Sequence, residues 1–375
     1  MQQASVTQAT SYAARRPGAR LAWIGQAFLV LLTLAVVAFI GLKAIAEPLL
    51  FVQFILSGLQ LGFVYALIAL GYTMVYGIVR LINFAHGDVF MVGSYVSFYA
   101  VARFRMHVWP AAVWPDLSPL LVLSIGSISV ILLAMFTCAI LAVVIERVAY
   151  KPLRDAPRIA ALITAIGVSF FLEYFGQLSF VFTAQRKIYQ RPFEVFAWYI
   201  KDGVHAVLPG QATPAGSITF SNIFLIIVIA AVLMQLVLQF LVRRTKIGKA
   251  MRATSFDKPA ARLMGINVDQ VISFTFAVGA AFAGLGGVLF AVAYPSISSL
   301  LGILPGLKAF VAAVLGGIGS IPGALVGALI MGISEALTAG YISTPMRDAV
   351  AFTILILVLL VRPTGIFGEP EKEKA

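Results

Sequence analysis

Long runs without a charged residue limit what this chain can fold into. No Asp, Glu, Lys or Arg occurs at 21–41, 49–79, 119–145, 220–242 or 271–294. A helix needs about 20 apolar residues to cross the hydrocarbon core of a bilayer. Hydrophobic residues make up 61% of the chain and charged residues only 11%, whereas a soluble domain carries roughly 25% charged residues. The sequence therefore predicts an all-α polytopic membrane protein.

The remaining apolar segments raise the predicted number of transmembrane helices to between eight and ten. We expect a span that ends near residue 102, a span at 159–183 and a last span that ends at Val361. The section 303–338 is rich in glycine, and we expect it to form two short or broken membrane segments. Their irregular backbone must then be buried in protein, because lipid cannot hydrogen-bond to it.

Two breaks and two glycine pairs are predicted within these spans. The breaks lie at Tyr76–Asp88 and at Gly319–Pro322. The G-xxx-G pairs are Gly58 with Gly62 and Gly323 with Gly327. Glycines at this spacing let two membrane helices approach closely.

The positions of Lys and Arg predict the orientation in the membrane. Cytoplasmic loops carry an excess of these residues, and an intracellular N-terminus places most of the 27 on the cytoplasmic side. Both termini are then cytoplasmic, as are the loops 146–158 and 243–267, while 184–219 is the longest outer loop. The net charge of +12 marks the ends of apolar runs and forms no patch interleaved with aromatic residues, so we expect no nucleic-acid partner.

The N-terminal part divides into a polar basic tail at 1–20 and an anchor helix with its linker at 21–48. Ala44-Ile-Ala46 resembles a signal-peptide cleavage site. The apolar region of a signal peptide is about 7–15 residues long, which is shorter than the run at 21–41, so we favour an uncleaved anchor. The main domain is expected at 49–368, followed by a charged tail at 369–375.

No motif for nucleotide binding or catalysis is present. Gly248-Lys249 lacks the other residues of a phosphate-binding loop. Gly284-x-Gly286 and Gly317-x-Gly319 lie in apolar membrane-length sequence, where close helix packing explains them better than a dinucleotide site. We expect no enzymatic activity and no cofactor in this chain.

The sequence also offers no metal site. Cys138 is the only cysteine, and His86, His107 and His205 lie far apart. A disulfide within the chain is therefore excluded, and no spacing typical of metal ligands occurs.

Ionisable residues inside membrane-length runs are candidates for transport sites, because they are costly in hydrocarbon. Four qualify: Asp88, Glu173, Lys308 and Glu335. His86 and Asp88 could form a proton relay. Alternatively, Asn83 and Asp88 cap broken helix ends and His86 satisfies a backbone group, and we favour this capping. Glu173 either lines the transport path or pairs within the bundle, and both possibilities stay open.

The segment 243–267 carries seven Lys or Arg residues and one acid between two spans. Ser255 or Asp257 can cap a short helix there, Pro259 suits its first turn and Gly265 suits a left-handed stop after it. We expect this helix at about 257–264, rising roughly 12 Å.

We expect a separate protein to press on this helix. The small residues Ala260 and Ala261 would allow close docking. The cations available to acidic groups of such a partner would be Arg252, Lys258 and Arg262. A membrane protein without its own energy source and with such a helix suggests a permease driven by a separate ATPase.

The chain resembles the LivH-type permeases of branched-chain amino acid ABC importers. The stretches that carry the resemblance are YALIALGYTMVYGIVRLINFAHGDVFMVGSYVSF (65–98), ERVAYKPLRDAPRIAALITAIGVSFFLE (146–173), GKAMRATSFDKPAARLMGIN (248–267), KAFVAAVLGGIGSIPGALVGALIMGISEAL (308–337) and LILVLLVRPTGIFG (355–368). In that family, the region at 252–266 corresponds to the EAA-like loop that contacts the ATPase. The residues that match its pattern are Arg252, Ala253, Ala261, Gly265 and Ile266.

The resemblance implies a bacterial inner-membrane heterodimer with a LivM-type permease. Two ABC ATPase subunits would bind ATP and Mg, and a periplasmic binding protein would deliver leucine, isoleucine, valine or a similar molecule. The anchor helix at 21–41 and the tail before it look additional to the family pattern. The outer loop at 184–219 is long for the family, so the docking of the binding protein is not transferred from it. Two alternatives remain, namely an ABC permease for urea, short amides or other amino acids, and an ion-coupled secondary carrier.

Overall fold

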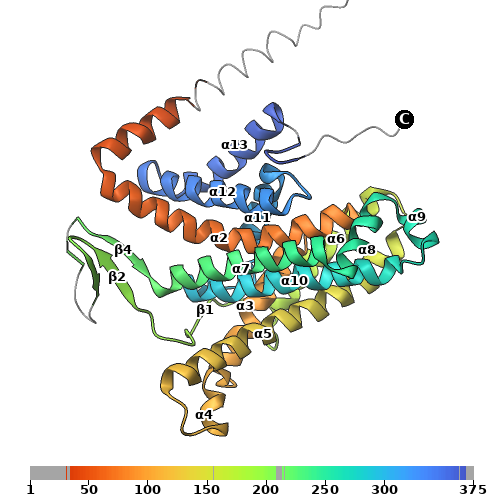
Figure 1. Ribbon diagram of the computed structural model, residues 1–375, viewed down its shortest axis with the longest axis horizontal. Coiled ribbons are helices and arrows are strands. Elements are labelled where there is room, and N and C mark those ends of the chain that lie inside the picture. The colour runs from red at the N-terminus through yellow and green to blue at the C-terminus, as the bar shows by residue number, and fades with distance from the viewer. Residues whose placement is uncertain are drawn as a thin grey trace, which may run out of the picture. The chain divides into compact units, whose positions relative to one another are not determined.

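The computed structural model describes residues 31, 34–154, 156–207, 213–214, 216–362 and 364–368 (Figure 1). The chain divides into two compact units, Met1–Pro48 and Leu49–Ala375. In the first unit, a short apolar helix covers Leu34–Ala46. The predicted tails at 1–20 and 369–375, and most of the predicted anchor helix at 21–41, lie outside the described residues.

Six helices in the described part of the chain are long and apolar enough to cross a membrane. They are α2 (Pro48–Val79), α5 (Pro119–Ile145), α6 (Arg158–Gly176), α7 (Asn222–Arg244), α10 (Val268–Ala293) and α12 (Ile321–Tyr341). These helices confirm the prediction of an all-α polytopic membrane protein. The prediction of a loop at 146–158 is wrong at its start, because α5 continues as a π-helix over Glu146–Tyr150 and a 3-10 turn over Lys151–Leu153.

Shorter helices form most of the remaining segments. They are α3 (His86–Ala102), the 3-10 helix η1 (Met106–Val108), α4 (Trp109–Val113), α8 (Lys246–Phe256), α9 (Lys258–Leu263), α11 (Ile303–Gly316) and α13 (Met346–Val361). Both predicted breaks are confirmed, since α2 and α3 are separated by residues 80–85 and α11 and α12 by residues 317–320. Eight to ten crossings are reached only if the shorter apolar helices are counted with the six long ones.

Short strands, which the sequence reasoning does not predict, gather at one end of the helices. They are β1 (Lys187–Ile188), β2 (Ala197–Ile200), β3 (Val204–Ala206), β4 (Ile218–Ser221) and β5 (Ser296–Ile297). β2 lies between β3 and β4 in an antiparallel sheet, and β1 pairs with β5. The 23 residues of α7 rise about 35 Å from β4 to α8. We therefore distinguish a strand end (β1–β5) and a hairpin end (α8 and α9), which lie at opposite sides of Figure 1.

Helix α10 is the most buried of the six long helices, with 72% of its most apolar window inside the protein. Its glycines let neighbouring helices touch its backbone. A Cβ atom at Gly287 would lie 2.3 Å from the carbonyl oxygen of Phe90 on α3, and one at Gly284 would lie 3.0 Å from that of Ala134 on α5. The Gly284-x-Gly286 sequence thus serves helix packing, as predicted.

The predicted close approach at Gly58 and Gly62 joins α2 to α12. A Cβ atom at Gly332 on α12 would lie 2.4 Å from both the carbonyl oxygen of Gly58 and the amide nitrogen of Gly62. The second pair packs α12 on α11, because a Cβ atom at Gly327 would lie 2.1 Å from the carbonyl oxygen of Ala312. Both glycine predictions are confirmed.

The break between α11 and α12 is held by the C-terminal segment. Gly317 and Gly319 have φ angles of +101° and +97°, which only glycine adopts without strain. The amides of Ile366 and Phe367 donate to the carbonyl oxygens of Leu315 and Gly316 at 2.9 and 3.0 Å. These bonds satisfy carbonyls that the end of a helix leaves free, as expected for irregular backbone buried in protein.

Candidate functional site

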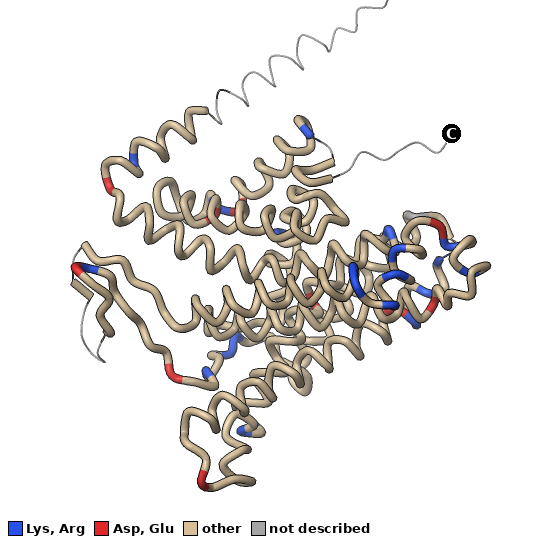
Figure 2. Tube along the Cα trace, in the orientation of Figure 1, with Lys and Arg blue, Asp and Glu red and all other residues tan. Residues whose placement is uncertain are grey.

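The basic segment between α7 and α10 folds as two consecutive helices, α8 and α9, which we call the basic hairpin (Figure 2). Thr245 caps α8 by accepting a 3.0 Å hydrogen bond from the amide of Gly248. Asp257 caps α9 in the same way, through the amide of Ala260 at 3.0 Å. The predicted helix is confirmed with Asp257 as its cap. The hydroxyl of Ser255 instead donates to the carbonyl oxygen of Arg252.

Helix α9 ends in the predicted left-handed stop. Gly265 has a φ angle of +79°. The amide of Ile266 donates to the carbonyl oxygen of Ala261, and that of Gly265 to the carbonyl oxygen of Arg262, both at 3.0 Å. This is the Schellman pattern, which fixes the direction in which the chain leaves a helix.

A tight corner connects α7 to α8. A Cβ atom at Gly248 would lie 2.2 Å from the carbonyl oxygen of Leu241 and 2.4 Å from that of Val242. The hydroxyl of Thr245 also donates to Leu241 at 2.6 Å. Backbone therefore packs on backbone where α7 meets α8. Sequence reasoning misses α8, since the seven cations of 243–267 suggested a loop with a single helix at about 257–264.

Two cations of α9 reach the ends of other helices. Nζ of Lys258 lies 3.4 Å from the carbonyl oxygen of Val79, the last residue of α2. The guanidinium of Arg262 lies 3.9 Å from Asp269 in the first turn of α10. Burial, together with the nearby guanidinium groups of Arg154, Arg80 and Arg262, lowers the pKa of Lys258.

A buried carboxylate, that of Glu146, stabilises the same region. Glu146 is fully buried and bonds to Arg154 and to the hydroxyl of Ser273, the latter at 2.6 Å. Arg154 also binds Asp269 at 2.5 Å, and Asp269 accepts a second ion pair from Lys151 at 2.9 Å. This network ties the end of α5 to α10. The sequence gives only a weak signal for it, because its members are far apart along the chain.

The predicted partner contacts divide into exposed and internal residues. Arg252, Ala260 and Arg262 are exposed, and so is Gly265. Ala253, Lys258 and Ile266 are partly buried. The prediction that Ala261 allows docking is wrong, because this side chain is 3% exposed and packs inward on the core.

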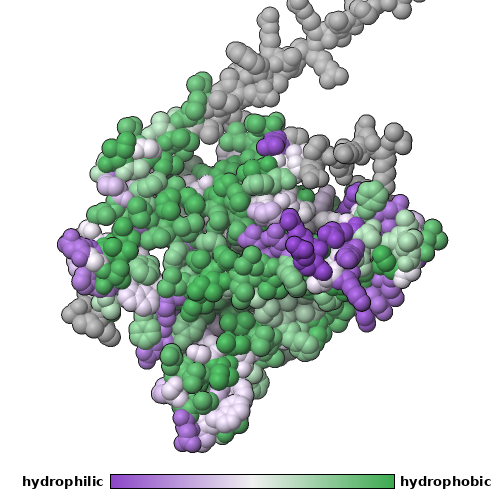
Figure 3. Space-filling model, viewed as in Figure 1, coloured by the Kyte–Doolittle hydropathy of each residue, from purple (hydrophilic) through white to green (hydrophobic). Residues whose placement is uncertain are grey.

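Apolar side chains that sequence reasoning missed cover the tip of the hairpin. Phe256, Leu263 and Met264 are 77%, 88% and 82% exposed. Hydrophilic surface gathers at the hairpin end, next to the apolar surface of the long helices (Figure 3). Exposed apolar patches with a polar rim are typical of interaction sites, so these three side chains are candidate contacts for a partner. The sequence signal that could have revealed this surface was the presence of three large apolar residues in a segment too polar to enter a membrane.

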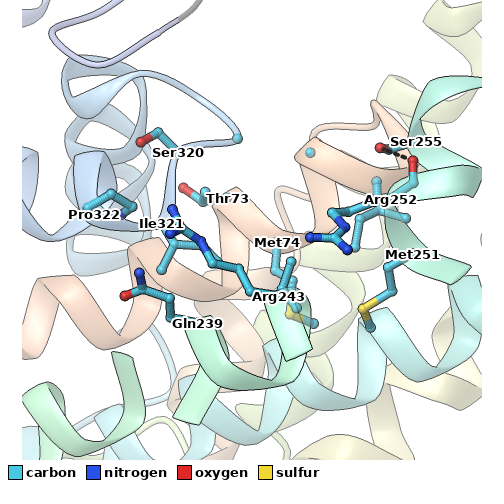
Figure 4. Close-up of a pocket in the computed structure, with 14 residues that line it drawn as sticks. Thr73, Met74, Gln239, Arg243, Met251, Arg252, Ser255, Ser320, Ile321 and Pro322 are labelled. Atoms are coloured by element: carbon cyan, nitrogen blue, oxygen red, sulfur yellow. Dashed lines mark hydrogen bonds between the residues drawn. The ribbon is translucent and has the colours of Figure 1, made fainter. Parts of the chain in front are cut away.

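A cleft of about 310 Å³ opens beside the hairpin (Figure 4). Arg252 and Ser255 of α8 line one side, and Arg243 and Gln239 of α7 lie close by. Other lining residues are Thr73 and Met74 of α2, Ser320 of the break before α12, and Ile321 and Pro322 at the start of α12. Helices α2, α7, α8 and α12 therefore meet at this hairpin-end cleft.

The break between α2 and α3 carries the predicted polar cluster, but not as helix caps. α3 has no side-chain cap. The Oδ1 atom of Asn83 instead accepts a 2.7 Å hydrogen bond from the hydroxyl of Tyr150. The capping interpretation is therefore wrong for the Asn83 and Asp88 side chains, because both bond to neighbouring helical segments. His86 is buried against Tyr72, with ring centroids 4.7 Å apart.

Asp88 and Glu173 meet at a single hydroxyl. Ser169 on α6 donates to Asp88 at 2.5 Å and lies 3.4 Å from Glu173. Asp88 is 1% and Glu173 5% exposed. The structure therefore joins these two predicted residues, whereas Asn83 and His86 make other contacts. Glu173 thus bonds to Ser169 within the bundle, and its role in the transport path stays a prediction.

An aromatic cluster lies between the two ends of α2. Tyr72 contacts Phe310 of α11 with ring centroids 5.7 Å apart, and Phe310 contacts Phe84 at 5.9 Å. Along α2, this cluster falls between Tyr65, which lines a cleft near the strand end, and Met74, which lines the hairpin-end cleft. Aromatic rings of α2, α11 and the break after α2 thus pack together at a level between the two clefts.

Comparison with known proteins assigns the family. The family model "Branched-chain amino acid transport system / permease component" matches residues 54–359. The chain is 44% identical over 330 residues to the high-affinity branched-chain amino acid transport system permease protein LivH of Salmonella typhimurium, covering 87% of this chain and 98% of the relative. LivH of Escherichia coli K12 matches equally.

A third relative is the BraD permease protein of Pseudomonas aeruginosa, which is 40% identical over 328 residues, or 86% of this chain and 98% of the relative. No solved structure matches the chain. The matched region includes the basic hairpin, both breaks and the two glycine pairs. On these matches, the chain belongs to the LivH-type permeases of the branched-chain amino acid transport family.

Proposed function

We propose that this chain is the permease subunit of an ATP-driven importer for branched-chain amino acids in the bacterial inner membrane. The observation that carries the proposal is the basic hairpin, which presents an apolar tip and exposed cations at one end of the membrane helices. The names of the LivH and BraD relatives supply the substrate class. In this proposal the hairpin end and both termini are cytoplasmic, in line with the excess of Lys and Arg there.

The hairpin is suited to an ATPase subunit as its partner. Phe256, Leu263 and Met264 would enter an apolar groove, while Arg252 and Arg262 would meet acidic groups at its rim. Two such subunits would bind ATP and Mg and supply the energy, so this chain needs no cofactor and acts as a transport subunit.

Three contacts would transmit a movement of the hairpin to the membrane helices. The Gly248 corner moves α7, the contact from Lys258 to Val79 moves the end of α2, and the Arg262–Asp269 pair moves α10. Since α2 and α7 both line the hairpin-end cleft, closure of the ATPase subunits would change the width of that cleft. This is a rigid-body transition driven from one end.

The other proposed partners fit the remaining surfaces. Only 17–28% of the apolar windows of α5, α6 and α7 is buried, compared with 72% for α10. Their outer faces leave room for lipid and for a LivM-type permease. The sheet β2–β4 at the strand end would face the periplasm, where a substrate-binding protein docks.

Reconstitution with the partner subunits tests this function. Proteoliposomes with ATP should take up leucine, with isoleucine and valine as competitors, and should not respond to an ion gradient without nucleotide. Competition by urea or acetamide instead would favour the alternative ABC substrates. Uptake driven by an ion gradient alone would refute the ATP-driven mechanism and favour a secondary carrier.

A further inference from the structure

A second cleft lies at the strand end of the helix pair α2 and α12. Its volume is about 420 Å³, within the range of roughly 300–1,000 Å³ typical of small-molecule sites. Tyr65 of α2 and Glu335 of α12 line it. Along α12, Glu335 lies 13 residues beyond Pro322 of the hairpin-end cleft, a rise of about 20 Å. The two clefts therefore open toward opposite ends of the same two helices.

A buried carboxylate forms the polar wall of this strand-end cleft. Glu335 accepts a hydrogen bond from the hydroxyl of Tyr65 at 3.0 Å and one from Nζ of Lys308 at 2.7 Å. Glu335 and Lys308 are 3% and 2% exposed. Arg347 of α13 approaches Glu335 at 3.5 Å and Asp348 at 3.7 Å, and Lys308 binds Asp348 at 2.6 Å.

The charges around this cleft do not balance. Lys308 and Arg347 are matched by Glu335 and Asp348, but Arg186 also lines the cleft. Arg186 is exposed, and within the described residues its guanidinium makes no ion pair or side-chain hydrogen bond. Arg186 is thus left over as a cation suited to the carboxylate of a ligand. Glu335 lines the same cleft, and because a carboxylate can accept about four hydrogen bonds, it can accept one from the ligand's ammonium group in addition to those from Tyr65 and Lys308.

The rest of the lining is apolar. Leu300, Leu301 and Leu304 follow one another on the segment before and within α11, and Leu61 and Phe290 face them from α2 and α10. Tyr294 adds a hydroxyl that can donate a hydrogen bond. An amphipathic ligand with a branched side chain matches this combination.

We propose that the strand-end cleft binds a free α-amino acid with an apolar side chain, its carboxylate at Arg186, its ammonium at Glu335 and its side chain on the leucines. This inference rests on the proposed function and extends it, by naming where this chain receives its substrate. The aromatic cluster of Tyr72, Phe84 and Phe310 lies beyond this cleft along α2 and α11. These rings would keep a bound ligand in the strand-end cleft.

Binding can be measured on the purified full chain in lipid nanodiscs by thermal shift. L-leucine should raise the melting temperature in a saturable manner. L-leucinamide, which lacks the carboxylate, and 4-methylpentanoate, which lacks the ammonium group, should produce no comparable shift. Equal shifts with leucine and leucinamide, or no shift with leucine at all, would overturn the proposal.

Arg186→Gln provides the residue test, with Lys187→Gln on the neighbouring strand position as the matched control. Arg186→Gln should raise the half-saturating leucine concentration by roughly tenfold or more, the effect of losing one charge-assisted hydrogen bond. Its melting temperature without leucine should equal that of the unmodified chain, because Arg186 has no ion-pair partner to lose among the residues that the structure describes. Unchanged leucine affinity in Arg186→Gln would contradict the site.

Transport by the reconstituted complex separates this inference from the proposed function. If ATP drives leucine uptake while Arg186→Gln leaves both leucine binding and uptake unchanged, only the cleft assignment fails. If the unmodified complex shows no ATP-driven leucine uptake, the proposed function fails, even where the thermal shift follows the predicted ligand pattern.

Discussion

Nζ of Lys258 lies 3.4 Å from the carbonyl oxygen of Val79, so that the short helix α9 touches the last residue of the membrane helix α2. A cation at this position interacts favourably with the negative end of the helix dipole. The two residues are 179 positions apart in the chain. This contact joins the surface that would meet an ATPase to a helix that lines both clefts.

Replacement of Lys258 by methionine should weaken transport without unfolding the protein. A cation at a helix C-terminus is worth about 0.3–1 kcal/mol, so uptake should fall roughly two- to fivefold. Reconstituted uptake, compared with Lys249→Met at an exposed site of the same hairpin, measures the effect. Equal rates in the two variants would argue against the contact.

The lowered pKa of Lys258 predicts a pH effect. As pH rises, a lysine with a lowered pKa loses its proton earlier than an ordinary lysine, and its contact with Val79 weakens. Arginine stays charged throughout. Lys258→Arg should therefore keep its uptake to a higher alkaline pH than the unmodified protein, whereas Lys249→Arg should not. Identical alkaline limits in all three proteins would count against this role.

Arg154→Met should destabilise the hairpin end strongly. Glu146 would stay fully buried without its cation, and breaking a buried ion pair from one side costs about 3–5 kcal/mol. The melting temperature in detergent should fall sharply, while Arg244→Met at an exposed site should change it little. The double variant Glu146→Gln, Arg154→Met should regain much of the loss, and an additive loss would contradict the pairing.

Gly332→Ala should separate α2 from α12. The added methyl group would lie 2.4 Å from backbone atoms of Gly58 and Gly62, and overpacking of this kind costs roughly 1–3 kcal/mol. Gly167→Ala on α6 is the matched control, since a Cβ atom there meets nothing within 4 Å. Thermal unfolding should show a loss for Gly332→Ala only. A similar small change in both variants would mean that the helices are not in close contact.

Asp88→Asn should preserve ATP-driven uptake. The amide can still accept the hydrogen bond from Ser169, so the expected cost is at most about one hydrogen bond, 0.5–1.5 kcal/mol. Uptake measured against pH should keep its shape in Asp88→Asn and in His86→Gln. A pH dependence that disappears in either variant would instead support the proton relay.

Much of the fold follows from local sequence patterns. Uncharged runs locate the long helices, and the breaks at Tyr76–Asp88 and Gly319–Pro322 follow from clustered polar residues and from Gly with Pro. The glycine pairs are predictable because only a missing Cβ atom lets two backbones touch. The Asp257 cap and the Gly265 stop are equally local, which explains why α9 is correctly placed.

The missed features depend on contacts between distant residues. Asn83 bonds to Tyr150, 67 positions away, so its local position suggested a cap that does not form. Ala261 looked available to a partner because burial depends on how α9 lies on α10. The strands β1 and β5 pair across more than 100 residues, and two-residue strands leave no periodic pattern.

The double variant Leu263→Ser, Met264→Ser tests most directly whether the hairpin couples ATP hydrolysis to transport. The measurement is ATP-driven leucine uptake by the reconstituted complex that carries this variant. Burying each apolar side chain in a partner groove contributes about 1.5–3 kcal/mol, so uptake and substrate-stimulated ATP hydrolysis should both fall by more than roughly tenfold. The chain should remain folded in the membrane, and Phe104→Ser, at a site that is 71% exposed and lies outside the hairpin, should leave both rates unchanged. Normal uptake and normal stimulation in the double variant would contradict the proposed coupling.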